Sequence, residues 1–348
     1  MAEMDSSSSA LKGYLPVLKW FTKRLLIALI TIYFAVTLSF FVVKAMPGDP
    51  VQALIQMFIS QYYMDYDSAK SLAEAAAPFI PKGSVLHQYV SYLVNFIHGN
   101  LGVSISYSTG TPVWDLLVQA IPWTVLVVGS ALIISFAIGI LIGTGMAYVH
   151  GSKIDSFLAV FFSIIRSIPE YVVALVLLIV FGFHFRWFPT RGAYSPNVTP
   201  RFNLPFIKDV LKHAALPILS WVIVHVSGWA LSMRASTVTV LGEDYITYAK
   251  IRGLPSRRIL ISYIGKNAIL PLFTSFMLSI GFMFGGSVFI EYIFAYPGVG
   301  NLLYQAITMR DTYLMLGVFN IIIVAVVISA LIADILYGVI DPRIRRGA

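Results

Sequence analysis

The sequence predicts an all-α integral membrane protein with six transmembrane helices and both chain ends in the cytoplasm. Of its 348 residues, 58% are hydrophobic and only 11% are charged, whereas soluble domains carry about 25% charged residues. The mean hydropathy is +0.82, and several apolar runs reach the roughly 20 residues that a helix needs to cross a bilayer. Helices are the expected form of these runs, because an open sheet would leave backbone groups unpaired in lipid.

Six apolar runs divide the chain, and we predict membrane spans at 22–43, 121–148, 156–182, 213–233, 269–293 and 313–338. The first run is too long for the core of a signal peptide, so we expect it to be retained as a span. The chain then consists of a cytoplasmic N-terminal segment (1–21), the first span, an extracytoplasmic loop (44–120), a five-helix core (121–338) and a cytoplasmic tail (339–348).

Basic residues set the predicted orientation. The segments on the side of the N-terminus hold fourteen of them: Lys12, Lys19, Lys23, Arg24, Lys153, Arg234, Lys250, Arg252, Arg257, Arg258, Lys266, Arg343, Arg345 and Arg346. The opposite segments are longer and hold nine. Because Lys and Arg gather on the cytoplasmic side of membrane proteins, this bias favours an N-in, C-in topology.

Composition excludes several other classes of protein. The chain has no cysteine, which excludes disulfide scaffolds, cysteine-ligated zinc and thiol catalysis. Its net charge of +8 does not indicate nucleic-acid binding, because the basic residues punctuate the apolar runs and form no stripe. The sequence has no phosphate-binding loop, HExxH zinc motif or nucleophile elbow. We therefore expect no enzymatic activity, and no cofactor or metal bound by this chain.

The outer loop 44–120 is too long to be a simple connection, because loops of this length are usually functional or carry their own structure. It begins with the turn-forming residues Met46-Pro47-Gly48-Asp49-Pro50 and contains a glycine-rich stretch from Gly99 to Thr111. We expect short helices between these stretches, packed on the outer mouth. A second outer loop, 183–212, is rich in proline and aromatic residues.

Two pairs of glycines lie four residues apart within predicted spans, Gly139 with Gly143 and Gly281 with Gly285. Small residues at this spacing allow two helices to approach closely. The pattern favours ordinary helix packing within this chain.

The inner loop 239–268 predicts a short, well-bounded helix between spans four and five. Its acidic residues, Glu243 and Asp244, lie in the first turn and its basic residues in the last, so both complement the helix dipole. Gly253 is placed to form a left-handed C-terminal cap, and Pro255 prevents continuation. We expect this helix to lie parallel to the membrane.

One side of this short helix offers a handle for a soluble partner. Tyr245, Tyr248, Ala249 and Arg252 fall on that side at helical spacing. The small Ala249 would allow the groove of a partner to come close. The alternative is a solvated surface helix with no further role.

This inner loop resembles a motif of a known family. The stretch from Glu243 to Gly253, followed by Asn267-Ala268-Ile269-Leu270-Pro271, resembles the EAA loop of ATP-binding-cassette importer permeases, which docks into a cleft of the ATPase subunit and transmits its closure. The resemblance implies a coupling role for Glu243, Asp244, Tyr245, Tyr248, Ala249, Arg252, Gly253 and Leu254. Many sugar and amino-acid permeases carry two alanines where this chain has Asp244-Tyr245, and its start is similar to the dipeptide, oligopeptide and nickel branch.

Other stretches resemble the same branch, in order, over roughly residues 20–345. They are Met46-Pro47-Gly48-Asp49-Pro50, Gly99-Asn100-Leu101-Gly102-Val103-Ser104, Arg234-Ala235-Ser236, the stretch from Glu291 to Gly300 with Phe294 and Pro297-Gly298, and the terminal Asp341-Pro342-Arg343-Ile344-Arg345. The long outer loop is similar to that of the first of the branch's two permease types.

The resemblance implies a fold like that of type I importer permeases and a set of partners. In such systems a second, similar permease completes the translocation path, and two ATPase subunits dock on the inner loops. An extracytoplasmic binding protein delivers substrate to the outer mouth. ATP and magnesium are then expected in the ATPase subunits and not in this chain, which would be a multi-pass protein of the cell membrane.

Two charged residues fall within the third predicted span, Arg166 and Glu170. Each costs about 2.5–3.5 kcal/mol at the bilayer centre, so neither should face lipid. At a spacing of four they can pair on one helix face. They either neutralise each other in a structural contact or line the translocation path with Tyr171. Pro169 between them suits a kinked, cavity-lining helix.

Further polar candidates lie in the later spans. Trp221 and His225 are four residues apart in span four, and a lone histidine is more often an interhelical hydrogen-bonding group than a metal ligand. Glu291 lies near the predicted outer end of span five, where it could cap the following turn or gate the outer mouth. We expect Asp334, near the inner end of span six, to pair with a base at the cytoplasmic rim.

The predicted function is therefore that of a permease subunit in an ATP-driven importer of oligopeptides or of another oligomeric solute such as an oligosaccharide. The alternative is an ion-coupled secondary transporter that uses the intramembrane Arg166 and Glu170. The helix at 243–254 discriminates between them, because a self-sufficient carrier has no use for a docking handle.

Overall fold

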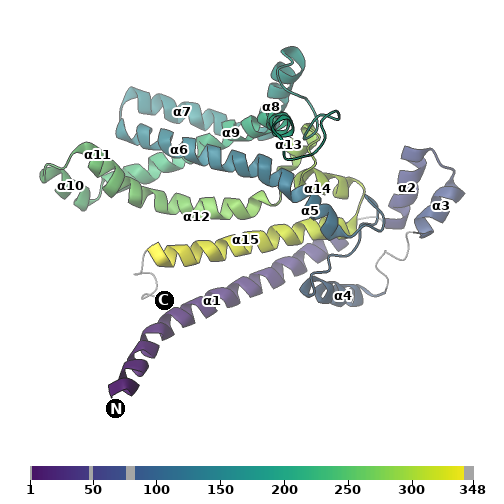
Figure 1. Ribbon diagram of the computed structural model, residues 1–348, viewed down its shortest axis with the longest axis horizontal. Coiled ribbons are helices and arrows are strands. Elements are labelled where there is room, and N and C mark those ends of the chain that lie inside the picture. Colours follow the sequence, from purple (N-terminus) through teal and green to yellow (C-terminus); the bar gives the residue numbers. More distant parts are fainter. Residues whose placement is uncertain (1, 47–49, 76–82, 341–348) are drawn as a thin grey trace.

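The computed structural model describes residues 2–46, 50–75 and 83–340 and is built almost wholly of helices (Figure 1). The terminal 341–345 stretch and most of the turn at 46–50 lie outside the described residues. The α-helices are α1 (Ala2–Lys44), α2 (Pro50–Tyr62), α3 (Tyr66–Ala75), α4 (Val85–Ile97), α5 (Val113–Thr124), α6 (Ser130–Tyr148), α7 (Lys153–Ser167), α8 (Glu170–Leu177), α9 (Leu204–Leu241), α10 (Asp244–Ile251), α11 (Ser256–Arg258), α12 (Lys266–Met283), α13 (Val288–Ile293), α14 (Val299–Thr308) and α15 (Thr312–Ile340).

Within the described residues, three π-helical segments continue these helices, and each joins two α-helical pieces or extends one. They are η2 (Val125–Gly129) between α5 and α6, η3 (Leu178–His184) after α8, and η4 (Ile259–Gly265) between α11 and α12. Short π-helical insertions are often found at functional sites. Here η4 lies next to α10 in the chain's inner loop.

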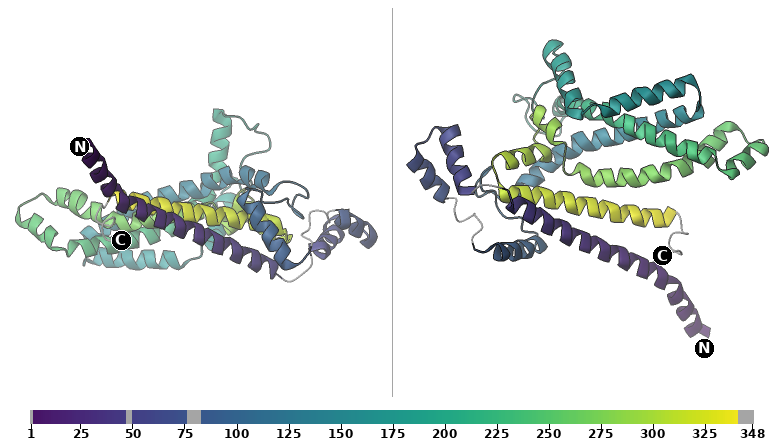
Figure 2. Two further views of the ribbon diagram at one scale, coloured as in Figure 1. Left: turned by 90° about the horizontal axis from the view of Figure 1, so that it is seen from below. Right: turned by 180° about the vertical axis from the view of Figure 1, so that it is seen from behind.

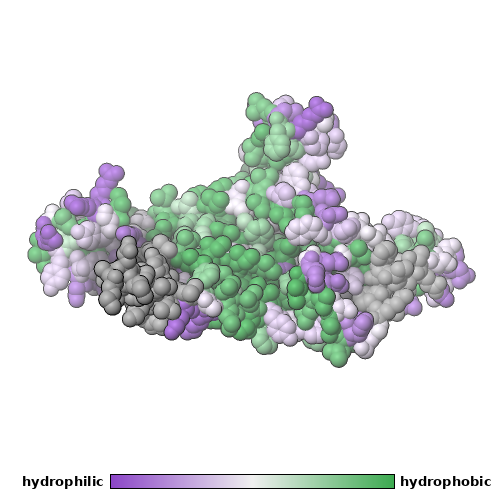
Figure 3. Space-filling view, turned by 60° about the horizontal axis from the view of Figure 1, so that its bottom comes forward, coloured by the Kyte–Doolittle hydropathy of each residue, from purple (hydrophilic) through white to green (hydrophobic). Residues whose placement is uncertain are grey.

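Long apolar helices run side by side as a bundle (Figures 1 and 2). Among the described residues, five are long and apolar enough to cross a membrane: Lys19–Lys44, Val113–Tyr148, Leu204–Leu241, Ser256–Met283 and Thr312–Leu336. A bent pair, Lys153–Ser167 with Glu170–His184, makes a sixth span if it is counted as one. Apolar side chains cover the middle of the molecule, and hydrophilic ones gather toward its ends (Figure 3).

The two ends of the bundle carry different elements. The end with α10 and α11 is here called the inner end, and the end with α13 and α14 the outer end, after the predicted orientation. Figure 1 shows the start of α1 and the end of α15 toward the inner end. The first and last described helices therefore begin and end on the side of α10, as the N-in, C-in topology requires.

The third span is broken, which corrects the prediction of one helix over 156–182. Its two halves, α7 and α8, meet at an angle of 88°. Ile168 between them has an extended backbone, with ψ of 124°, because a residue before proline avoids the helical region. Pro169 then starts α8. The break puts Arg166 and Glu170 on different helices.

Other boundaries of the predicted spans also differ. Span two begins at Val113 instead of 121, and span four is α9, which exceeds the predicted 213–233 at both ends. Span five ends at Met283, so Glu291 lies beyond it in α13. Hydropathy identifies only the part of a helix that crosses lipid. The helix itself can be longer, because its backbone hydrogen bonds continue until a capping residue or a proline ends it.

The four spaced glycines pack helices within this chain, as predicted. A Cβ on Gly139 or Gly143 would meet the backbone and side chains of α9, and one on Gly281 or Gly285 would meet α15. These glycines thus allow α6 to approach α9, and α12 to approach α15, more closely than a larger residue would.

The outer loop contains the short helices that the sequence predicts. Helices α2 and α3 form a hairpin whose small core includes Ile55, Ala69, Ala73 and Ile105. Helix α4 lies against α1, where the rings of Phe40 and Tyr92 stack with centroids 5.1 Å apart. These elements extend the molecule beyond the outer end of the bundle (Figure 2).

Candidate functional site

Helix α10 lies within the predicted 243–254 and ends at the glycine that the sequence predicts as its cap. Glu243 is its N-cap residue, and Asp244 lies in its first turn. Gly253 adopts a left-handed backbone with φ of 70°. Its N–H donates to the carbonyl of Lys250 at 2.9 Å, and the N–H of Leu254 donates to that of Ala249 at 3.3 Å. This pair of bonds is the Schellman arrangement, which ends a helix at a glycine.

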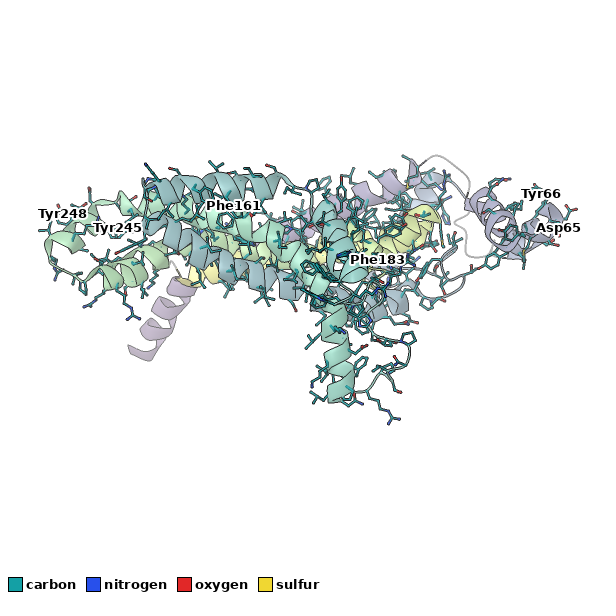
Figure 4. All side chains as sticks on the ribbon, turned by 90° about the horizontal axis from the view of Figure 1, so that it is seen from above. Asp65, Tyr66, Phe161, Phe183, Tyr245 and Tyr248 are labelled. Atoms are coloured by element: carbon teal, nitrogen blue, oxygen red, sulfur yellow. The ribbon has the colours of Figure 1, made fainter. Side chains whose placement is uncertain are left out.

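The accessible face of α10 differs from the predicted one in a single residue. Tyr245 is 38% exposed and Tyr248 is 68% exposed, and Figure 4 shows both at the inner end of the bundle. Asp244 and Arg252 are also exposed. Ala249, expected on this face, is only 3% exposed. The prediction was wrong for Ala249 because this residue lies, with Ile246, on the buried side of α10.

The buried side of α10 packs on a cluster shared by three other elements. Ile246 is fully buried, and Leu254 packs against the same cluster. Asn267 Nδ2 of α12 donates to the hydroxyl of Tyr245 at 2.8 Å. The buried members of the cluster come from α9, α10, η4 and α12, and they are Met233, Ile246, Ala249, Ile259, Ile264, Ala268 and Leu272. A movement of α10 must therefore displace the inner ends of its neighbours.

A second group at the inner end involves Asp155, which the sequence analysis missed. Its carboxylate is 1% exposed and is bound by Arg234 of α9 through two bonds, from Nε at 2.5 Å and from Nη2 at 2.7 Å. His150 Nδ1 lies 3.0 Å from it, and the N–H of Gly151 donates at 3.2 Å. The signal in the sequence is Ser152 three residues before Asp155, which is the spacing of a capping box.

The predicted pair of Arg166 and Glu170 does not form. No ion pair joins the two within the described residues; Glu170 instead contacts His225 of α9, whose Nε2 lies 3.2 Å from Oε2. Ser287 donates its hydroxyl to the other oxygen of Glu170 at 2.7 Å. Arg166 is exposed and lies near Gly228 of α9. The reason is the break at Pro169, which removes the common helix face.

Aromatic side chains surround the Glu170 contact. The rings of Trp221 and His225 stack with centroids 3.4 Å apart and an angle of 11° between their planes, so the predicted common face is present. Tyr171 is 41% exposed and lies against Phe289, with centroids 5.6 Å apart. A carboxylate, an imidazole and an exposed guanidinium thus flank an aromatic surface at the break.

Glu291, which we expected either to cap the following turn or to gate the outer mouth, caps the start of α14. Its side chain is fully buried. It accepts the hydroxyl of Thr124 at 2.9 Å and the N–H of Asn301, in the first turn of α14, at 3.1 Å. Thr124 in turn accepts the N–H of Val299 at 2.8 Å. Burial raises the pKa of Glu291 to about 7. These contacts join span two to α14.

A third buried carboxylate, Asp311, organises the outer loop and was also missed. One oxygen accepts three consecutive backbone N–H groups, those of Ile105, Ser106 and Tyr107, at 2.9–3.0 Å. Ser104 donates its hydroxyl to the same oxygen at 2.5 Å. The other oxygen caps the first turn of α15. The glycine-rich stretch is therefore bound to the start of the last span.

The expected ion pair of Asp334 is confirmed. Arg24 Nη1 of α1 lies 2.8 Å from Oδ2 of Asp334 in α15, and both side chains are a little over one third exposed. The pair joins the first and last spans.

Comparison with known proteins gives a consistent result. Residues 139–346, more than half of the chain, match the family described as binding-protein-dependent transport system inner membrane component. The chain is 34% identical to an oligopeptide transport system permease protein of Bacillus subtilis, over 88% of this chain and 93% of that protein. It is 30% identical to an oligopeptide transport system permease protein of Haemophilus influenzae, over 94% and 100%. It is 28% identical to a di/tripeptide transport system permease protein of Pseudomonas aeruginosa, over 93% and 98%.

Proposed function

The chain belongs to the family of inner membrane components of binding-protein-dependent transport systems, and on that basis we propose that it imports peptides as one half of a path shared by two permeases. It is a multi-pass membrane permease subunit of an ATP-binding-cassette importer, which is a transport subunit and not an enzyme. The alternative of an ion-coupled secondary transporter is therefore wrong.

The names of the relatives support peptides as the substrate class. The three relatives described above are named for oligopeptides or for di- and tripeptides, which favours peptides over oligosaccharides and nickel chelates. A free peptide carries an ammonium group at one end and a carboxylate at the other. A path that carries both signs of charge suits such a substrate.

The path that we propose runs past the break at Pro169. Glu170, with His225, offers a negatively charged group that can bind an ammonium, and the exposed Arg166 offers a donor for a carboxylate. Trp221 and Tyr171 supply aromatic surface for side chains. Charged residues within membrane spans are otherwise costly, which supports a role in the path.

We propose that α10 couples the permease to ATP hydrolysis. The observation that supports this role is the exposed face of α10, which bears two tyrosines on a helix that is capped at Gly253. We propose that this face docks into a cleft of an ATPase subunit, and that two such subunits bind ATP and magnesium for the complex. A second permease completes the path, and an extracytoplasmic binding protein delivers the peptide. Closure of the ATPases would then move α10 and, through its buried cluster, the inner ends of α9 and α12.

The cap at Gly253 tests this assignment. Gly253→Val places a β-branched residue at a left-handed position, which strains the end of α10. Gly253→Asn is the matched control, since asparagine tolerates this backbone. We expect Gly253→Val and deletion of 243–254 to abolish ATP-driven peptide uptake while membrane insertion is retained, and Gly253→Asn to keep most of the uptake. Normal ATPase binding by the deletion variant would contradict the proposal.

A further inference from the structure

The buried carboxylate of Asp155 has no part in the function proposed so far. It lies in the first turn of α7 at the inner end and is 1% exposed. Arg234 binds both of its oxygens, and a two-bond guanidinium–carboxylate contact fixes orientation as well as distance. His150, at 3.0 Å from the carboxylate and 3.4 Å from the guanidinium, is the other titratable group in contact with the pair.

Arg234 belongs to the same helix that supports α10. It lies in α9, which continues without a break to Leu241 and is followed closely by α10. Its neighbour Met233 is 2% exposed and is a member of the cluster beneath α10. Ser236, two residues further, donates its hydroxyl to the carbonyl of Ala268 in α12 at 2.7 Å. The inner part of α9 is thus tied to α10, α12 and α7 within about one turn.

The other end of α7 leads to the proposed path. From Asp155 the helix runs without interruption to Ser167, next to the break at Pro169. Beyond the break, Glu170 of α8 contacts His225 of α9. Besides apolar packing, two polar contacts therefore join the unit of α7 and α8 to α9, Asp155–Arg234 at the inner end and Glu170–His225 near the break.

We propose that Asp155 and Arg234 are a positioning pair, which carries the displacement of α10 along α7 to the break where the peptide path lies. This inference rests on the proposed function of α10 and of the path. Coupling between distant sites passes through rigid elements joined by specific contacts, and α7 is such an element, with the Asp155–Arg234 contact at its inner end and Phe162 packed on α9 further along. Without the pair, α10 and α9 would still move with the ATPases, but the inner end of α7 would keep only apolar packing to α9 and would follow less closely.

The experiment uses the complete importer, with both permeases, the ATPase subunits and the binding protein, reconstituted in lipid vesicles. Peptide uptake and ATP hydrolysis are measured on the same vesicles for Asp155→Asn, Arg234→Lys and the exchanged pair Asp155→Arg with Arg234→Asp. We expect hydrolysis stimulated by the binding protein to stay near the wild-type rate, and uptake per ATP to fall about tenfold in the single variants. The exchanged pair should recover part of the lost uptake.

A distance measurement distinguishes a pair that transmits the movement of α10 to α7 from a pair that only stabilises the fold. Because the chain has no cysteine, spin labels can be placed by Val160→Cys on α7 and Ile328→Cys on α15, at positions that are 61% and 47% exposed. We expect ATP to change the distance between these labels in the wild-type background and to change it less with Asp155→Asn. Asp334→Asn, which breaks the Arg24–Asp334 ion pair between α1 and α15, is the control and should leave both the ratio and the distance change intact.

Three outcomes would overturn the inference. The first is an uptake per ATP in Asp155→Asn that equals that of the wild type. The second is a loss of uptake and of hydrolysis in equal proportion, because such a loss would indicate that the pair only stabilises the fold. The third is the same loss in Asp334→Asn. If the wild-type complex itself took up no peptide with ATP, the proposed function would fail instead, and the two failures are thereby distinguished.

Discussion

At the residue scale, the buried carboxylates of Asp155, Glu291 and Asp311 each bind the start of a helix to a distant segment of the chain. Each accepts backbone N–H groups at or near the start of a helix, where such donors have no partner within the helix. Each also binds a group from a segment far away in the sequence. A buried acid is costly unless it is bound in this way, so these residues specify where α7, α14 and α15 begin relative to their neighbours.

Glu291 gives a pH-dependent prediction. In the folded protein its pKa is raised to about 7 by burial, whereas the unfolded chain releases the proton near the ordinary value of 4.5. Between these values the folded state holds more protons, so stability falls as pH rises from 4.5 to 7 and is constant above. The loss is about 3 kcal/mol.

The measurement is the thermal midpoint of the purified protein in detergent between pH 5 and pH 8. We expect the midpoint of the wild type to fall with rising pH more steeply than that of Glu291→Gln, which cannot ionise. Parallel curves for the two proteins would show that Glu291 titrates near its ordinary pKa.

At the scale of elements, α10 has one exposed face, which is proposed to dock, and one face buried in the protein. The exposed face carries Tyr245 and Tyr248, and the buried face carries Ile246 and Ala249. The buried face needs a small residue because α10 lies close to η4 and α9 in the shared cluster. A substitution on one face should therefore affect binding alone, and one on the other should also affect stability.

Tyr248→Ala and Ala249→Leu are the matched pair that tests this separation. Tyr248 is 68% exposed, so its loss should change the free energy of unfolding by less than about 0.5 kcal/mol. Leucine at 249 overfills a packed site and should cost about 1–3 kcal/mol. We expect both variants to weaken binding of the ATPase subunit and only Ala249→Leu to lower the thermal midpoint. A destabilised Tyr248→Ala would assign that side chain to the core.

Local signals in the sequence predicted much at this scale. The acids of the inner loop predicted the start of α10 to within a residue, and its glycine predicted the C-terminal cap at Gly253, because helix caps depend on neighbouring residues only. Ala249 was wrongly predicted to be exposed. Helical spacing shows which residues share a face, but it does not show whether that face is exposed or buried. The Glu170–His225 and Asp155–Arg234 contacts join segments 55 and 79 residues apart, and no local pattern records such distances. Pro169 signalled a kink, yet its angle of 88° is set by packing.

At the scale of the whole molecule, the bundle separates an inner end, where coupling is proposed, from an outer end with its own helical hairpin. The start of α1 and the end of α15 lie toward the inner end (Figure 1), and the exposed tyrosines of α10 and the tip residues Asp65 and Tyr66 mark opposite ends of the molecule (Figure 4). If the orientation from the positive-inside rule holds, these ends face different compartments.

Single cysteines test this orientation directly, since the chain has none of its own. Tyr63→Cys in the outer hairpin replaces a residue that is 91% exposed, and Lys250→Cys lies on the exposed surface of α10. We expect a membrane-impermeant maleimide to label Tyr63→Cys in intact cells and Lys250→Cys only after permeabilisation, with the unsubstituted chain as the unlabelled control. The reverse pattern would place α10 outside and remove its access to ATPases.

The break in the third span also has a consequence for how the protein is made. Ser167, Ile168 and Pro169 are all exposed in the single chain, and a helix end leaves carbonyls without donors. In hydrocarbon each such group costs several kcal/mol, so irregular backbone at membrane depth persists only against protein or water. In the proposed complex the second permease would cover this joint, so we expect a copy synthesised alone to expose it to lipid and to be degraded faster by membrane proteases.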